Sequence, residues 1–416
     1  MRALFVSPTF PEDFSKAVLG IHQRMRMWLE ALQSPDLDLD ILFLPSSRVR
    51  VGPETAAAVT RDLFECWRIR ANVVVCPREP DERRDGIASR AAAYVAATLR
   101  PSRHPFFRPY IGRPQREALA QCLAESPEIV FFHRLQSTGP ATRFSLRGMR
   151  TYLDLDDVEH RAFAREIAQP PWSSPKRRFY FQVATLWWAE RTAIARSRYS
   201  FVCSEADRRY LQRTMRVRNV VVVPNAVARV DDGLLTTEPN VLFIGTYGYS
   251  PNVVAAEYLI QRVWPLLTRL CPNARLLIAG SRPENIPSCA NPPAGVEFLG
   301  FVPDLSALYR RTRLLCCPIQ SGGGTRVKIL EAASHGIPVV STPIGAEGLD
   351  FTPDTHIILR GDATGLAEAC AALLSKDGPA QRIGISARER VRALYSRDGV
   401  VSRMRAILGD ELRLAE

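Results

Sequence analysis

The sequence predicts an α/β protein of two domains, each built on a doubly wound parallel sheet. Three observations support this fold class. At 416 residues the chain is long for one hydrophobic core and suits two. Short apolar strands alternate with amphipathic helices along most of its length, which is the pattern of parallel sheets. The order strand, glycine-containing loop, helix, strand opens each half, beginning near residue 2 and near residue 241.

The first half carries a series of short apolar runs separated by helical or polar segments. The expected strands are 2–7, 39–44, 73–76, 128–132, 150–153, 199–203 and 220–223. After the first strand, residues 21–33 are predicted to form an amphipathic helix, because their apolar residues fall on one stripe: Met25, Trp28, Leu29 and Leu32. Ser204 is expected to be a helix N-cap, with Asp207 at the third helical position.

The second half repeats the same alternation after a polar linker at 226–240. The expected strands are 241–244, 274–279, 296–299, 314–318 and 337–342, and the expected helices are 253–270, 305–311, 325–335, 363–374, 382–394 and 398–414. These elements predict an N-terminal domain over 1–228 and a C-terminal domain over 229–416. The latter includes a final helix over about 396–416.

The most informative stretch is 321–349, SGGGTRVKILEAASHGIPVVSTPIGAEGL. Glycines let the backbone approach a ligand closely, and a following helix N-terminus offers free N–H groups to an anion. Lys328 and Glu331 lie one turn apart on that helix, so a cation and a carboxylate could bind phosphates and sugar hydroxyls in turn. The alternative is that the glycine loop is only a connector. No Gly-Lys-Ser/Thr ends the loop, so it is not a P-loop.

This stretch resembles the donor-site motif of family-four, retaining glycosyltransferases with the GT-B fold, whose pattern is close to G-T-R-x-K-x-L-E-A-x-A-x-G-x-P-V-V-S-T. The resemblance implies two Rossmann-like domains facing a cleft, with the last helix crossing back to the first domain. It implies that Glu331 holds the ribose of a nucleotide-sugar. It also implies that the diphosphate is held by the loop amides and by Arg326 or Lys328, which are the catalytic cations of this prediction. The loop residues are Gly322, Gly323, Gly324 and Thr325.

Two departures from the family pattern shape the expected site. Many relatives carry a glutamate eight residues before the ribose glutamate, and Gly323 stands there in this chain. Many also have an arginine and a lysine after the first strand of the C-terminal domain, whereas the loop from Gly245 to Asn252 contains no cation. We therefore expect Arg326 and Lys328 to carry the diphosphate charge. The resemblance also places Gly245 beside the donor and the backbone of Phe301 and Val302 beside the base.

The first half supplies weaker candidates. In the resembled family the loop after the first strand faces the donor phosphate, and Gly20 is its expected close-approach residue. His133 follows an apolar strand and resembles the family histidine beside the donor sugar, so it is expected to bond a sugar hydroxyl. Asp154 and Asp157 belong to an acidic cluster that is predicted either to shape the acceptor side or simply to end a strand. A D-x-D in that cluster suits a divalent metal, but the resemblance implies no metal.

Charge is concentrated in one half of the chain. Of the 55 Lys and Arg and 43 Asp and Glu, residues 1–230 hold 36 and 24, and residues 231–416 hold 19 of each. The basic half favours an anionic partner such as a membrane surface, although arginines spread over a solvated surface would give the same balance. Nine scattered cysteines indicate neither disulfides nor zinc and fit a cytoplasmic setting. No apolar run is long enough to span a membrane.

The predicted function is transfer of a sugar, with retained configuration, from a nucleotide-diphosphate sugar to an acceptor hydroxyl. The donor would be a UDP-, GDP- or dTDP-sugar, and no cofactor is expected. The acceptor would be a saccharide or a lipid-linked sugar in cell-surface polysaccharide or glycolipid assembly. The protein would be cytoplasmic or peripheral on the inner face of the membrane, and no nucleic-acid motif is present. The alternatives are a nucleotide-sugar epimerase on the same fold and a non-catalytic protein that binds the nucleotide-sugar.

Overall fold

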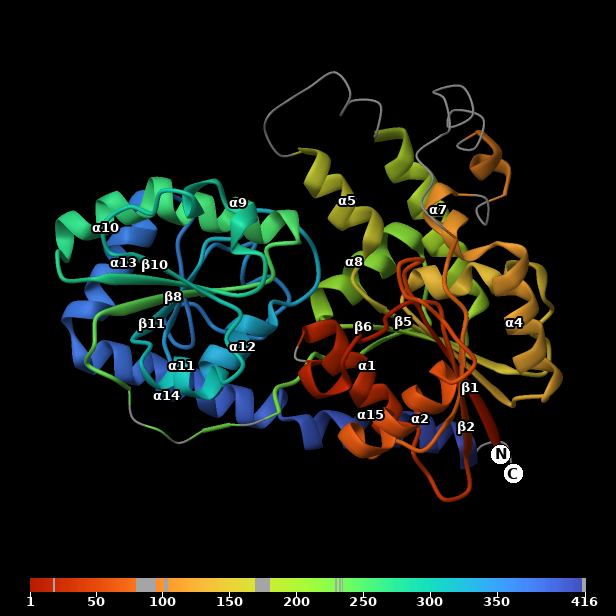
Figure 1. Cartoon of the computed structure of the whole chain (residues 1–416). Helices are drawn as coiled ribbons and strands as arrows, with labels where there is room; N and C mark the ends of the chain where they lie inside the picture. Colours follow the sequence, from red (N-terminus) through yellow and green to blue (C-terminus); the bar gives the residue numbers. More distant parts are fainter. Residues whose placement is uncertain are drawn as a thin grey trace. The chain divides into compact units, whose positions relative to one another are not determined.

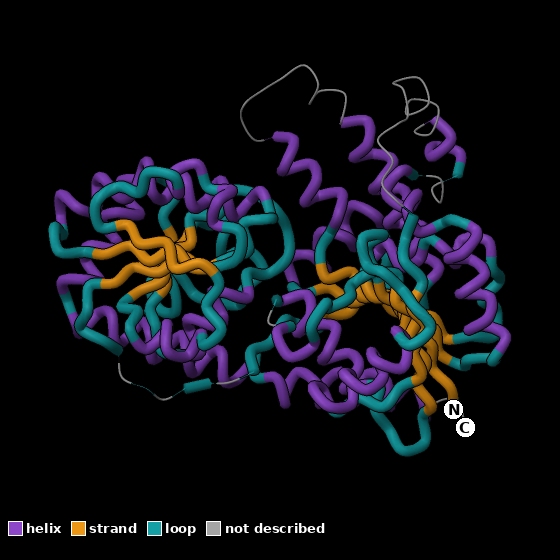
Figure 2. The backbone as a smooth tube through the Cα atoms, in the orientation of Figure 1, coloured by secondary structure: helices purple, strands orange, loops and turns teal. Residues whose placement is uncertain are grey.

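The computed structural model describes residues 1–17, 19–79, 95–100, 104–168, 180–228, 230, 231, 233 and 235–413. The chain divides into two compact units. Unit 1 comprises Met1–Pro224 and Val401–Glu416, and unit 2 comprises Asn225–Val400. Each unit has its own parallel sheet flanked by helices (Figures 1 and 2).

The sheet of unit 1 has seven strands in the order β3-β2-β1-β4-β5-β6-β7. They are β1 (Arg2–Ser7), β2 (Asp38–Phe43), β3 (Asn72–Val75), β4 (Ile129–His133), β5 (Arg150–Asp156), β6 (Tyr199–Val202) and β7 (Val220–Val222). The chain reverses its direction of travel across the sheet between β1 and β4. The carboxyl ends of these two strands therefore form the switch point where doubly wound sheets usually bind ligands.

The helices of unit 1 cover this sheet with their apolar faces. They are α1 (Gly20–Ala31), α2 (Thr55–Trp67), α4 (Arg113–Ala124), α5 (Glu159–Ala168), α7 (Tyr180–Arg196) and α8 (Glu205–Met215), with short 3-10 turns at Phe14–Lys16, Pro105–Tyr110, Leu135–Thr138 and Pro140–Arg143. The predicted stripe of α1 is buried, and its Trp28 ring packs 4.7 Å from Phe131 and 4.5 Å from Phe201 between ring centroids. The predicted cap of α8 is confirmed, since Ser204 accepts a hydrogen bond from the backbone N–H of Asp207.

Unit 2 repeats the doubly wound arrangement with six strands in the order β10-β9-β8-β11-β12-β13. They are β8 (Asn240–Ile244), β9 (Arg275–Ala279), β10 (Val296–Gly300), β11 (Leu314–Cys317), β12 (Val339–Ser341) and β13 (Ile358–Leu359). The helical elements are α9 (Ser250–Tyr258), a π turn (Leu259–Val263), α10 (Trp264–Leu270), 3-10 turns (Pro283–Asn285 and Pro287–Cys289), α11 (Leu305–Arg310), α12 (Val327–Ser334), α13 (Ala363–Ser375), α14 (Asp377–Leu394) and α15 (Arg397–Arg413). The switch point of this sheet lies between β8 and β11.

Several helix boundaries differ from the sequence-based expectation, each for a local reason. The helix expected over 253–270 is interrupted by the π turn, next to Pro265, which has no N–H to continue the ladder. The helix expected from 325 begins at Val327, because Arg326 is extended, with φ −85° and ψ 94°. The helix expected from 382 begins at Asp377, since Pro379 is tolerated in a first turn.

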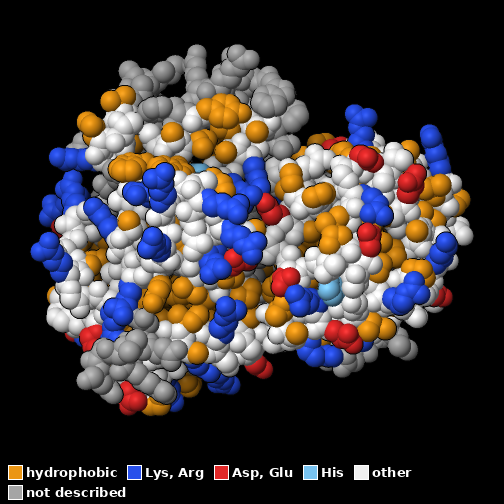
Figure 3. Space-filling model, turned by 180° about the vertical axis from the view of Figure 1, so that it is seen from behind, with side chains coloured by type: hydrophobic (Ala, Val, Ile, Leu, Met, Phe, Trp, Pro, Cys, Tyr) orange, Lys and Arg blue, Asp and Glu red, His pale blue; other side chains and the backbone are white. Residues whose placement is uncertain are grey.

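The final helix, α15, starts in unit 2, and its residues from Val401 onward group with unit 1. There Arg405 Nη2 donates a hydrogen bond to the carbonyl of Glu30 at 3.0 Å. The most basic aromatic segment of the sequence, around residues 170–178, lies outside the described residues. On the face shown in Figure 3, Lys and Arg side chains are spread over the surface of unit 1.

Candidate functional site

The candidate site is at the switch point of the unit 2 sheet. Strands β8 and β11 are neighbours, and Leu314 of β11 pairs with Val241 of β8. The chain leaves them toward opposite sides of the sheet, so the loops that follow them separate at the carboxyl edge. One loop begins at Gly245, and the other contains the three glycines that precede α12.

The glycine loop adopts a conformation that side chains disfavour. Gly322 has φ +92° and Gly324 has φ +64°, both in the left-handed region. A Cβ on Gly322 would lie 2.7 Å from the Tyr249 hydroxyl. The end of the loop is held by a hydrogen bond, in which Asn225 Nδ2 donates to Thr325 Oγ1 at 2.9 Å. Glycine is thus needed here for both backbone angle and space.

Arg326 folds back onto this loop. Its guanidinium donates to the carbonyls of Gly323, of Gly324 at 2.8 Å and of Ser321 at 3.2 Å. These bonds engage Nη1 and Nη2, whereas Nε is buried without a hydrogen-bond partner. In this structure Arg326 therefore shapes the glycine loop and adds positive charge near it.

Lys328 lies in the first turn of α12 and its ammonium has only neutral partners. Nζ donates to Asn252 Oδ1 at 2.8 Å and lies 4.4 Å from the centroid of the Phe243 ring. Asn252 Nδ2 donates to the Thr246 carbonyl at 2.9 Å, which fixes the orientation of the amide. A Cβ on Gly245 would lie 3.0 Å from Nζ, so glycine leaves room for the ammonium. Burial lowers the pKa of Lys328 to about 8.

Glu331 follows one turn along α12 and is also uncompensated by an opposite charge at hydrogen-bond distance. Its Oε2 accepts a hydrogen bond from the Tyr309 hydroxyl at 3.2 Å. Burial raises the pKa of this carboxyl to about 7, and the Tyr309 hydrogen bond and the Lys328 charge act in the opposite direction. Among the described residues, neither Glu331 nor Lys328 forms an ion pair.

The loop after β10 also lies at the carboxyl edge of this sheet. Gly300 ends the strand with φ +64°, and the Phe301 side chain is 51% exposed. Val302 is partly buried against the core of the unit. Asp304 then caps α11 by accepting from the Ala307 N–H, and α11 brings Tyr309 to Glu331. The loop after β10 thus leads into the helix whose Tyr309 contacts Glu331.

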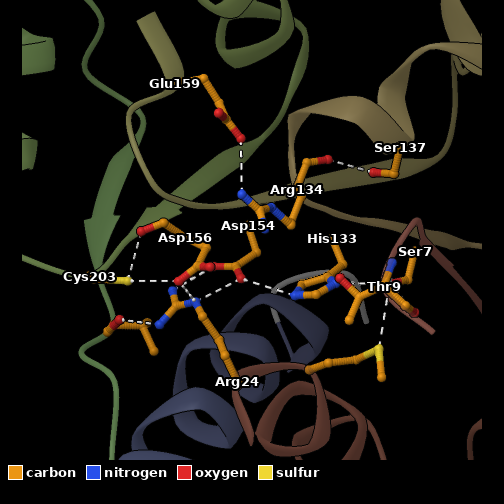
Figure 4. Close-up of polar contacts among 12 residues, drawn as sticks. Ser7, Thr9, Arg24, His133, Arg134, Ser137, Asp154, Asp156, Glu159 and Cys203 are labelled. Atoms are coloured by element: carbon orange, nitrogen blue, oxygen red, sulfur yellow. Dashed lines mark hydrogen bonds and ion pairs between the residues drawn. The ribbon is translucent and has the colours of Figure 1, made fainter. Parts of the chain in front are cut away.

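Two of the candidate residues of unit 1, His133 and Asp154, are fully buried, and their polar contacts are shown in Figure 4. The ring of His133 is fully buried, with Nδ1 at 2.9 Å from Ser7 Oγ, and its Nε2 is buried without a hydrogen-bond partner. Burial lowers its pKa well below the usual range, so the ring is neutral near pH 7. A sugar hydroxyl would reach His133 only if the surrounding side chains moved.

Asp154 is committed to a buried ion pair. Arg24 donates to it through Nε at 2.8 Å and Nη2 at 2.5 Å, and both side chains are fully buried. Arg24 Nη1 also donates to the Val223 carbonyl. This geometry corrects the expectation that Asp154 faces an acceptor. Asp157 is only partly buried on the loop after β5, and Gly20 is the partly buried first residue of α1.

Sequence reasoning did not identify Asn252, Tyr309 or Arg24 as participants. The signal for Arg24 was its place on the apolar stripe of α1, four residues before Trp28. Asn252 and Tyr309 carry no such signal, because only the folded chain brings them to Lys328 and Glu331. Within the described part of the chain, no group of three or more His, Cys, Asp or Glu side chains could hold a metal ion. No helix there is long and apolar enough to cross a bilayer.

A family model and one curated relative each match part of this chain. The family model for glycosyl transferases group 1 matches residues 238–376, which lie in unit 2. A curated relative, an uncharacterized 44.6 kDa protein in the cps region of Klebsiella pneumoniae, is 24% identical over 131 residues, covering 30% of this chain. The match spans only 34% of that protein.

Solved structures match along the whole chain. Sucrose-phosphate synthase from Thermosynechococcus elongatus is 17% identical, with a TM-score of 0.68 and full coverage of both chains. HepE from Anabaena, solved with UDP-glucose, is 14% identical, with a TM-score of 0.64, covering 99% of this chain and 100% of its own. TarM is 12% identical, with a TM-score of 0.66 and 97% coverage of each chain.

The chain therefore has the two-domain Rossmann-like GT-B fold. Its second unit contains the region that matches the family model for glycosyl transferases group 1.

Proposed function

We propose that this protein transfers a sugar from a nucleotide-diphosphate sugar to an acceptor hydroxyl, with retention at the anomeric carbon. The observation that supports this most is the pair formed by Lys328 and Glu331 beside the glycine loop. The pair presents an ammonium and, one helical turn away, a carboxylate, each held by neutral partners. That arrangement suits a ligand with an anionic end and a hydroxyl-bearing ribose.

In this proposal Lys328 and the N-terminus of α12 bind the diphosphate, and Glu331 accepts hydrogen bonds from the ribose. The bond between the anomeric carbon and the diphosphate oxygen breaks, and a bond to the acceptor oxygen forms. The diphosphate leaves with the electron pair and takes up the acceptor proton. Fixed positive charge at the leaving group lowers the barrier, because preorganised electrostatic stabilisation is usually the largest catalytic contribution.

The remaining assignments rest on the resemblance. The donor is a UDP-, GDP- or dTDP-sugar, transfer is independent of metal, and the acceptor is a saccharide or lipid-linked sugar in surface polysaccharide or glycolipid assembly. The backbone at Phe301 and Val302 contacts the base. Asp157 is assigned to the acceptor side, and titration of an Asp157 variant with acceptor tests this. Gly20 is assigned to the donor side, and titration of a Gly20 variant with donor tests that.

The donor assignment is tested by calorimetric titration of UDP, GDP and dTDP and their sugars. The tightest ligand is expected to lose affinity by about 10- to 100-fold in Lys328→Met, the value of a hydrogen bond to a charged group. Glu331→Gln is expected to lose about 10-fold. Lys376→Met and Glu368→Gln are the matched controls, because both residues are exposed in the same unit. Full affinity in both site variants would disprove the placement of the donor.

We also propose that the basic surface of unit 1 contacts an anionic membrane. The excess of Lys and Arg in residues 1–230 supports this. The protein is expected to sediment with vesicles containing anionic lipid at low salt and to be released as the ionic strength rises. Sedimentation that is absent, or unaffected by salt, would reject it.

A further inference from the structure

We propose that Tyr309 is a positioning residue for the nucleotide: its hydroxyl holds one oxygen of Glu331 and leaves the other to the ribose. This inference rests on the proposed function of Glu331. It assigns a role to a residue outside the glycine-loop motif, on the short helix α11 that follows β10.

Tyr309 is placed by α11, the short helix after the base-side loop. Asp304 fixes the start of this helix by accepting a hydrogen bond from the Ala307 N–H at 3.2 Å. The Tyr309 side chain is buried, at 3% exposure, and its hydroxyl donates to Glu331 Oε2 at 3.2 Å. Within the described part of the chain, Glu331 Oε1 has no hydrogen-bond partner. The carboxylate is therefore held at one oxygen only.

The Tyr309 ring is itself held in place. It stacks on the His335 ring, with centroids 4.8 Å apart and an interplanar angle of 25°. His335 Nδ1 lies 3.6 Å from Asp231 Oδ2, and the Asp231 N–H donates to the Ser334 carbonyl at 2.9 Å. Arg388 Nη1 donates to the Asp231 carbonyl. The phenol thus has little freedom to swing away, so the direction of its O–H bond is set before a nucleotide arrives.

The hydroxyl also affects the charge of Glu331. The groups that act on this carboxyl are Tyr309 from α11 and Lys328 from its own helix. Both lower its pKa against the larger effect of burial, which raises it to about 7. Removing the hydroxyl would raise that pKa further. Fewer molecules would then carry an ionised Glu331 near neutral pH, and a protonated carboxyl accepts fewer hydrogen bonds from a ribose.

The experiment compares Tyr309→Phe with wild type by calorimetric titration of UDP, GDP and dTDP, using the nucleotide that wild type binds most tightly. Phenylalanine keeps the stacking on His335. We expect the variant to bind about 5- to 10-fold more weakly near pH 6.5, within the net value of one ordinary intramolecular hydrogen bond. The deficit should shrink near pH 8.5, where Glu331 is ionised in both proteins. Binding of inorganic pyrophosphate, which has no ribose, should not change.

Two further variants separate positioning from a structural effect. In Glu331→Gln, adding Tyr309→Phe should cause little additional loss, because the two residues act through one contact. Tyr395→Phe is the matched control: Tyr395 is buried in the same unit and its hydroxyl accepts a hydrogen bond from the Asp350 N–H at 2.7 Å. That control should lower thermal stability but leave nucleotide affinity at wild-type level at both pH values.

The possible outcomes are distinct. If Tyr309→Phe matches wild type, loses the same factor at both pH values, or weakens pyrophosphate equally, the positioning role is overturned. If wild type binds none of UDP, GDP and dTDP, the proposed function fails with it. If wild type binds a nucleotide, and the loss of affinity in Tyr309→Phe depends on pH and on the presence of the ribose, both the positioning role and the proposed function are supported.

Discussion

The two units contain the same kind of switch point but treat its charges in opposite ways. In unit 1, Arg24 and Asp154 form a two-bond ion pair with no exposed surface, and His133 is enclosed beside them. In unit 2, Lys328 and Glu331 are held only by an amide, an aromatic ring and a phenol. In unit 1 the two buried charges neutralise each other. In unit 2 the charges of Lys328 and Glu331 are not paired with an opposite charge at hydrogen-bond distance.

This difference indicates which switch point is built for an anionic ligand. The pKa of Lys328 is lowered to about 8 and that of Glu331 is raised to about 7, so the fold makes both ionisations harder. A bound diphosphate would stabilise the ammonium of Lys328, and ribose hydroxyls would stabilise the carboxylate of Glu331 by hydrogen bonding. The Arg24–Asp154 pair offers no similar gain, because its charges already satisfy one another.

The largest expected effect is a difference in stability between two single variants, each of which removes one buried cation. Arg24→Met should destabilise unit 1 by about 3–5 kcal/mol, because it leaves Asp154 buried without its partner. Lys328→Met should change stability by less than about 1 kcal/mol, because no buried counter-charge is abandoned. Urea unfolding of both variants measures this. Equal destabilisation by the two substitutions would remove the distinction between the switch points.

The next effect is the pH dependence of donor binding. In the proposed site Glu331 would bind a ribose as the carboxylate, which predominates above about pH 7. Lys328 would bind phosphate as the ammonium, which predominates below about pH 8. Affinity for UDP-glucose or GDP-mannose should therefore rise toward pH 7, be greatest between about 7 and 8, and fall above that. These ligands suit the test because a phosphate diester does not titrate in this range.

Titration at several pH values gives the profile, and Glu331→Gln is the matched control. It should lose the rise below pH 7 and retain the fall above pH 8. A flat profile in wild type would mean that neither group contacts the ligand.

The smallest effect tests the space around Lys328. Gly245→Ala would place a Cβ 2.9 Å from Asn252 Cγ and 3.0 Å from Lys328 Nζ. The ammonium would have to shift, so nucleotide affinity should fall by about 10-fold, with a stability cost of about 1 kcal/mol. Gly361→Ala is the control, because nothing lies within 4 Å of its added Cβ. Equal affinity in both variants would show that the position of Nζ is unimportant.

The fold was largely predictable from the sequence because strand runs such as 241–244 are apolar and closely bounded by turn residues. There are two exceptions. Helix α2 was not anticipated, although its buried residues Val59, Leu63 and Trp67 recur every four positions, which is the spacing of one helix face. Strand β13 has two residues, which is too short to show a period.

The site was predictable only where one segment supplies it. Lys328 and Glu331 share a helix, so their spacing alone places them together. Tyr309 lies on α11 and Asn252 lies on α9, so their contacts with Glu331 and Lys328 depend on how these helices pack. Arg326 follows the motif, yet its guanidinium turns to the carbonyls of its own loop, which spacing along the chain does not indicate.

The central claim is that the ammonium of Lys328 binds the diphosphate of an activated sugar. A crystal structure with a bound nucleotide-sugar tests it most directly. We expect a phosphate oxygen within hydrogen-bond distance of Lys328 Nζ and a ribose hydroxyl at Glu331 Oε1. A diphosphate bound away from the N-terminus of α12 would contradict the account.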